Sequence, residues 1–105
     1  MSDDALDDMM QVLRAEYLAE APARLAEMAA QLDAWERGSV EAGDKVRRLA
    51  HQLTGSAGSY GFTEASNAAR QMEQLLKPHP DADAALLAVL RAALAYITAQ
   101  LQPST

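Results

Sequence analysis

Apolar side chains recur every three or four residues along most of this 105-residue chain. Over the first third, nine of them follow one another at this spacing: Leu6, Met9, Leu13, Tyr17, Ala21, Leu25, Met28, Leu32 and Trp35. A helix puts residues at this spacing on one face, whereas a half-buried strand needs strict alternation of apolar and polar residues. The first third is therefore predicted to be helical.

The composition extends this prediction to the whole chain. Of fifty-two apolar residues, twenty-three are Ala and fourteen are Leu, whereas Val, Ile and Thr together number nine. Helices favour Ala and Leu, and strands favour β-branched and aromatic residues. We therefore expect an all-α protein, and the length suits a single domain over residues 1–105.

Three further apolar stripes occupy residues 46–60, 65–76 and 86–101, and residues that end helices separate them. Gly38 supplies the left-handed conformation that commonly ends a helix, and the second stripe stops at Gly61. The segment Lys77-Pro78-His79-Pro80 contains two prolines and interrupts the helix after Leu76. Because the connections are short, we expect an antiparallel up-down-up-down four-helix bundle, with room for a short extra helix at the N-terminus.

Three details of the helices stay open. Pro22 lacks an amide N–H and crowds the carbonyl four residues earlier, so the first third forms either two helices or one kinked helix. Thr63 is a suitable N-cap for the third helix, and either Asp81 or Asp83 can cap the last one.

The charge of the chain excludes several classes of partner. The formal net charge is −6 with a pI near 4.7, and Lys45, Arg47 and Arg48 form the main basic cluster, so we expect no nucleic-acid binding. No apolar run approaches the roughly 20 residues that span a bilayer. The N-terminus is acidic, whereas the start of a signal peptide is basic. The chain also contains no cysteine. We expect a cytoplasmic monomer without membrane contact.

His51 lies on the polar side of the second predicted helix. At 100° per residue it points about 140° to 160° away from the apolar direction, and thus to solvent. Its neighbours on the helix surface are Arg47, Thr54, Gly55 and Gly58.

Two glycines inside a helix cost roughly 1 kcal/mol each relative to Ala. Gly55 and Gly58 face away from the predicted core, so close helix packing does not explain them, and the remaining reason is the close approach of another molecule to His51. An imidazole has an ordinary pKa of about 6.5 and is a competent nucleophile toward a phosphoryl group near pH 7. The residues by themselves predict a histidine that is accessible to a partner.

A resemblance makes this prediction more specific. The run Leu-Ala-His-Gln-Leu-Thr-Gly-Ser-Ala-Gly-Ser-Tyr-Gly-Phe at residues 49–62 resembles the signature of histidine phosphotransfer (HPt) domains. Residues 17–22 resemble the aromatic-to-proline stretch before the second helix of this family, and residues 72–76 resemble the helix packed behind its active histidine.

The resemblance implies a phosphocarrier. His51 would take a phosphoryl group from the aspartate of a response-regulator receiver domain or from a sensor histidine kinase, and pass it to a receiver. The partner would dock on Gly55, Gly58, Arg48 and Gln52. This chain would need no cofactor or metal of its own, because Mg²⁺ belongs to the receiver.

One departure from the family pattern concerns the position three residues after the histidine. The family commonly has Lys there, and this chain has Thr54, whose hydroxyl can donate a hydrogen bond but brings no charge. Arg47, one turn before His51, is the natural substitute for that cation. The same departure keeps an alternative open, namely an interaction module of the HPt fold that binds a kinase or receiver without phosphoryl turnover.

Two more residues lie at spacings where the family can place a polar group toward the imidazole. They are Arg70 and Glu73. A carboxylate at this place could orient the ring nitrogen, but we expect Glu73 to be an ordinary solvated residue. His79 lies between two prolines and is interpreted as part of a loop, and two histidines without ligand spacing predict no metal site. Beyond His51, the chain shows no catalytic base or nucleotide pocket, and its glycines lack the preceding strand that a nucleotide loop requires.

Overall fold

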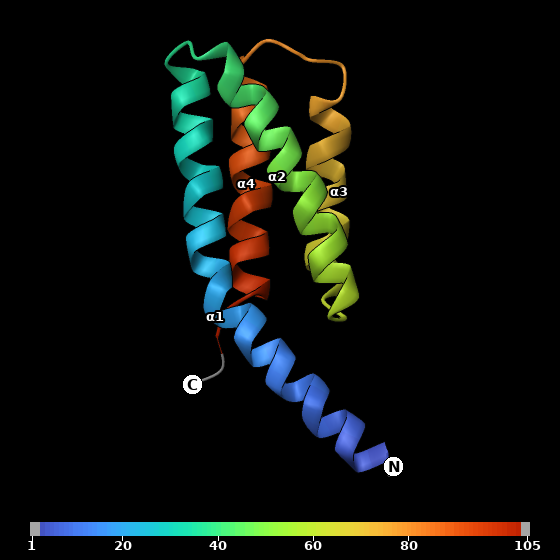
Figure 1. Cartoon of the computed structure of the whole chain (residues 1–105). Helices are drawn as coiled ribbons and strands as arrows, with labels where there is room; N and C mark the ends of the chain where they lie inside the picture. Colours follow the sequence, from blue (N-terminus) through green and yellow to red (C-terminus); the bar gives the residue numbers. More distant parts are fainter. Residues whose placement is uncertain (1–2, 104–105) are drawn as a thin grey trace.

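The computed structural model describes residues 3–103 and consists of four helices (Figure 1): α1 (Asp3–Glu36), α2 (Val40–Ser59), α3 (Thr63–Leu76) and α4 (Ala84–Gln100). Successive helices run in opposite directions, and α2 and α4 each pack against both α1 and α3. No strand occurs in the described range. The predicted antiparallel up-down-up-down four-helix bundle is confirmed, and none of these helices is long and apolar enough to cross a bilayer.

The core is built from the predicted stripes. Alanine lines much of the contact between α2 and α3, which lets their backbones come close, and larger side chains fill the space toward α1 and α4. The largest fully buried side chains are Met28, Leu32, Val46, Met72, Leu90, Ile97 and Leu101. Ser66 of α3 is the only buried polar residue in the described part of the chain.

Helix α1 runs without interruption through Pro22 and bends. In Figure 1 the N-terminal part of α1 leaves the axis of the bundle at a clear angle. The ring of Pro22 crowds the carbonyl of Leu18 and removes one helix hydrogen bond, which is a common cause of such a bend. Of the two arrangements that the sequence allowed, the single kinked helix is the one observed, and no separate short helix precedes it within the described residues.

The apolar stripe of α1 is buried only from Tyr17 onward. Residues 3–16, which we call the arm, extend past the end of the bundle, and the side chains of Leu6 and Met9 remain 51% and 54% exposed. Arg14 ties the base of the arm to the α2–α3 turn, because its Nε donates a 2.8 Å hydrogen bond to the carbonyl of Tyr60. The 3–4 spacing thus predicted the helix correctly but not how far the bundle would cover it.

Both predicted glycine stops are confirmed. Gly38 and Gly61 have positive φ angles of 107° and 86°. At each end the residue after the glycine donates its N–H to a carbonyl five residues back, from Ser39 to Ala34 at 3.0 Å and from Phe62 to Ala57 at 2.8 Å. The last carbonyls of α1 and α2 are satisfied in this way, and the chain reverses within three residues.

The start of α4 settles which aspartate is the cap. Asp83 is the N-cap, and its carboxylate accepts a 2.7 Å hydrogen bond from the amide of Leu86. The expected cap at Thr63 is wrong, because Thr63 is already the first residue of α3 and Phe62 precedes it without a side-chain cap.

We predict that Asp83→Ala lowers the free energy of unfolding by about 1 kcal/mol, because it leaves the amide of Leu86 without its acceptor. Asp81→Ala is the matched control and should change this free energy by less than about 0.5 kcal/mol, since its carboxylate caps no helix. Urea denaturation followed by circular dichroism measures both. Equal losses in the two variants would contradict the assignment.

Candidate functional site

His51 lies in the middle of α2 and points away from the core, as predicted. Its side chain is 75% exposed. The ring is nevertheless held in place, because Nδ1 lies 2.5 Å from Oε2 of Glu73 on α3. The expectation that Glu73 is an ordinary solvated residue is therefore wrong: its side chain is only 20% exposed and is turned toward His51.

This contact decides which ring nitrogen can react. An ionised carboxylate can only accept hydrogen bonds, so the proton of the neutral imidazole lies on Nδ1. The lone pair is then on Nε2, at the edge of the ring away from Glu73. The pair thus presents one nucleophilic nitrogen to solvent and keeps the ring from rotating.

The register between α2 and α3 brings Glu73 to His51. The two helices are joined by the tight turn at Gly61, and the hydroxyl of Ser66 donates a 2.7 Å hydrogen bond to the carbonyl of Thr54. A Cβ at Gly58 would come within 3.1 Å of that hydroxyl oxygen. Close approach of α3 therefore favours glycine here, and the expectation that only a partner molecule explains Gly58 is corrected.

Gly55 differs from Gly58. A Cβ at Gly55 would meet no atom within 4 Å, so nothing in the described chain requires glycine at this position. The argument that a bare surface next to His51 serves the approach of another molecule therefore applies to Gly55.

His51 opens into a shallow pocket of about 320 Å³ between α2 and the C-terminal end of α3. Three cationic side chains line it, Arg47 and Arg48 from α2 and Lys77 from the end of α3, together with Gln52 and Glu73. Three positive charges against one carboxylate make this pocket attractive to anions, although the chain as a whole carries a net charge of −6.

Arg47 has a further property that singles it out. Its Nε is buried and has no hydrogen-bond partner among the described residues. A buried donor of a charged group costs free energy when it lacks an acceptor, so this nitrogen is ready for one. Arg47 also lines the pocket, so its charge is available to an anionic group bound there.

The remaining predicted site residues lie elsewhere. The hydroxyl of Thr54 donates a 2.9 Å hydrogen bond to the carbonyl of Ala50 within its own helix, so the donor that the sequence offered for a phosphoryl group is already used, and Thr54 does not line the pocket. Arg70 donates to Asn67 at 3.1 Å rather than meeting the imidazole.

The sequence analysis did not predict a site role for Lys77, which it interpreted only as part of the segment that interrupts the helix at Pro78. The signal was the spacing: Lys77 follows Glu73 by four residues, which places both on the same face of α3 at its last turn. Once Glu73 is known to face His51, Lys77 is expected to lie beside them.

A family model identifies the family of this chain. The model of the Hpt domain matches residues 12–100, which is most of the chain and includes His51 and the pocket around it. The chain belongs to the Hpt domain family. Comparison with curated proteins and with solved structures gave no match. Membership links this Hpt domain to histidine phosphotransfer in two-component systems, and the resemblance of residues 49–62 to the family signature is confirmed.

We predict opposite effects of adding a methyl group at the two glycines. Gly55→Ala should raise the free energy of unfolding by roughly 0.5 to 1 kcal/mol, because Ala is the better helix former and meets no neighbour. Gly58→Ala should give no gain or a loss, because the buried and hydrogen-bonded Ser66 has little freedom to move. Thermal and urea denaturation of the pair measure the difference, and a similar gain in both would contradict the close packing described for Gly58.

Proposed function

We propose that this Hpt domain is a phosphocarrier in which Nε2 of His51 accepts a phosphoryl group from the aspartyl phosphate of a receiver domain, or from a sensor histidine kinase, and passes it to a receiver aspartate. The observation that carries the proposal is the exposed imidazole whose Nδ1 is held by Glu73. The other histidine of the chain, His79, lies in a loop and has no such cationic surroundings.

In the transfer step, a bond forms between Nε2 and phosphorus while the bond from phosphorus to the aspartate oxygen breaks, and the aspartate leaves as a carboxylate. The phosphorylated ring keeps its proton on Nδ1 and becomes positively charged. The carboxylate of Glu73, in contact with that nitrogen, stabilises this charge. Glu73 is in this account a positioning residue that acts through His51.

The incoming phosphoryl group is anionic, and the cationic pocket offers it two kinds of support. Arg47 brings a charge and an unpartnered buried donor, and Lys77 brings a second charge from the other helix. We infer that together they replace the lysine that the family usually has where this chain has Thr54. The Mg²⁺ of the receiver would stabilise the same transition state from the partner's side, so this chain supplies the nucleophile and the docking face.

Docking would use the surface next to the ring. Gly55 leaves open space there, and Gln52 and Arg48 line the pocket that contains His51. A partner's backbone can approach His51 closely over Gly55 because no side chain projects from it.

We predict that incubation with a phosphorylated receiver or an active sensor kinase labels the protein with phosphate that is acid-labile and alkali-stable. His51→Ala should lose the label, because it removes the nucleophile. His79→Ala is the matched control and should keep it. Label that persists in His51→Ala would overturn the proposal, and stable binding of partners with no transfer to any of them would favour the interaction module.

Arg47→Ala should lower the rate of phosphoryl transfer at least about tenfold, since it removes one donor and one charge from the phosphoryl group. Arg37→Ala, which changes an exposed arginine outside the pocket, should leave the rate within about twofold of the unmodified protein. Single-turnover transfer from a phosphorylated receiver measures both, after circular dichroism has shown that the variants fold. An unchanged rate in Arg47→Ala would remove Arg47 from the mechanism.

A further inference from the structure

Helix α4 lies on the outside of the bundle but has the composition of a buried helix. Among its 17 residues, Ala84–Gln100, the only charged one is Arg91. Arg91 is already paired, because its guanidinium donates hydrogen bonds to Asp33 and Glu36 of α1. A helix that is apolar on all sides is normally covered on all sides. The outer side of α4 is therefore a candidate contact surface.

The solvent-facing residues of α4 form one apolar strip, which we call the α4 face. At 100° per residue they lie within about 60° of the direction opposite the buried side of the helix. The two largest, Val89 and Tyr96, are 53% and 44% exposed. The α4 face consists of Ala85, Ala88, Val89, Ala92, Ala95, Tyr96 and Ala99, all of them exposed.

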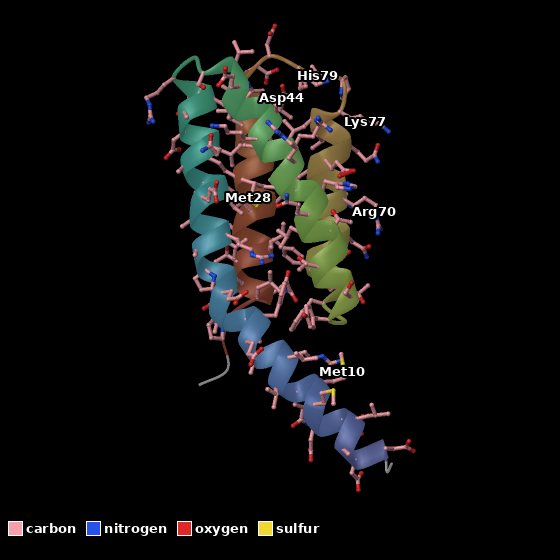
Figure 2. The ribbon with its side chains drawn as sticks, viewed as in Figure 1. Met10, Met28, Asp44, Arg70, Lys77 and His79 are labelled. Atoms are coloured by element: carbon pink, nitrogen blue, oxygen red, sulfur yellow. The ribbon has the colours of Figure 1, made fainter. Side chains whose placement is uncertain are left out.

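The outer sides of α2 and α3 differ from the α4 face. Figure 2 shows Arg70 and Lys77 projecting from the outer side of α3, and Arg48 and His51 are exposed on α2. Within residues 3–103, α4 packs only against α1 and α3 and does not touch α2. The α4 face is thus uncovered, and a partner bound to it would leave His51 free.

The α4 face is symmetric about Ala92. Its other members lie three, four and seven positions from Ala92 in both directions along the chain. When two copies of α4 cross antiparallel at Ala92, Val89 lies level with Ala95 of the second copy, and Tyr96 lies level with Ala88. Each large side chain then meets an alanine. A two-fold interface requires one patch to be complementary to itself, and the α4 face meets this requirement.

The alanines of the α4 face favour close contact between helices. They follow one another at alternating steps of three and four residues, from Ala85 to Ala99, which is the spacing of a coiled-coil seam. Small side chains at such a contact let the helix axes approach to about 8 Å. Tyr96 donates its hydroxyl to Glu64 of α3 at 3.1 Å, which holds the ring at the edge of this seam.

The charge of the chain also favours the α4 face as the contact between copies. Each copy carries a net charge of −6, so two copies repel wherever their acidic surfaces meet. The α4 face contains no charged residue, and Arg91 beside it is paired with Asp33 and Glu36. Two copies can therefore meet here without bringing like charges into contact.

The size of the face sets the expected strength of a dimer. A 17-residue helix is about 26 Å long, and the bundle measures 19 Å along its shortest axis, so a face of these dimensions covers roughly 500 Å² on each copy. Specific interfaces bury about 1,000 Å² or more in total, and those near this limit are weak. The area thus suffices for a weak dimer.

We propose that two copies of this chain associate through their α4 faces, antiparallel and related by a two-fold axis that passes near Ala92. The dimer buries Val89 and Tyr96 against alanines of the second copy. It departs from the monomer expected from the sequence. The proposal does not depend on phosphotransfer, because His51 lies on α2 and stays exposed in both copies.

We predict that sedimentation equilibrium between about 5 μM and 1 mM shows a monomer–dimer equilibrium with a dissociation constant of roughly 10 to 500 μM. Ala92→Glu should raise this constant at least about tenfold, because it places two carboxylates side by side at the axis. Ala30→Glu is the matched control, since Ala30 is exposed on α1 outside the α4 face, and it should leave the constant within about twofold. Circular dichroism checks that both variants keep their helices.

Cysteine cross-linking tests the arrangement of the two copies. The chain has no cysteine, so each introduced one reports on a single position. Ala92→Cys should form a disulfide-linked dimer on mild oxidation at least about tenfold faster than Ala30→Cys, because a disulfide needs two Cα atoms within about 7 Å. A mixture of Ala85→Cys and Ala99→Cys should cross-link faster than either variant alone, as antiparallel pairing requires.

Several outcomes would overturn the proposal. A monomer at every concentration up to about 1 mM would overturn the dimer and leave the α4 face to a different protein. A dimer that Ala92→Glu does not weaken, or that Met9→Glu on the arm weakens instead, would show that the copies meet elsewhere. Faster cross-linking of Ala85→Cys alone than of the mixture would overturn the antiparallel arrangement.

Discussion

The close approach of α2 and α3 at Gly58 is the constraint on which the site depends. With no side chain at this position, Ser66 comes near enough to donate its hydroxyl to the carbonyl of Thr54, and the turn at Gly61 fixes the register of the two helices. Glu73 then reaches the ring of His51 from the neighbouring helix. A Cβ at Gly58 would come within 3.1 Å of the Ser66 hydroxyl oxygen, so a side chain there would disturb the contact that fixes α3 against α2.

The packing of the bundle holds one exposed side chain in a fixed orientation. Exposed histidines usually sample several rotamers, whereas His51 is held by a carboxylate that is itself mostly buried. The bundle also concentrates positive charge at one point, because Arg47 and Arg48 on α2 face Lys77 at the end of α3. An acidic chain therefore presents a local basic pocket.

A helical wheel, which places successive residues 100° apart, predicted the direction of the His51 side chain correctly, but it did not predict which side chains of the other helices surround the ring. The direction of His51 depends only on its position within α2, because the apolar stripe of that helix fixes which side is buried. The role of Glu73 depends on how α3 is rotated and shifted relative to α2, which no spacing within either helix contains. For the same reason the wheel assigned Gly58 to a partner, since it could not show that α3 passes directly over that residue.

By itself, the sequence determined the four helices, their stops at Gly38 and Gly61 and the exposure of His51, because each of these follows from local periodicity or from one residue's backbone preference. Only the tertiary structure decided that Glu73 holds the imidazole, that the hydroxyl of Thr54 is used within α2, and that the arm extends beyond the bundle. These features depend on distances between residues far apart in the chain. Such distances are set by the packing of whole helices against one another, and a pattern within one helix does not specify them.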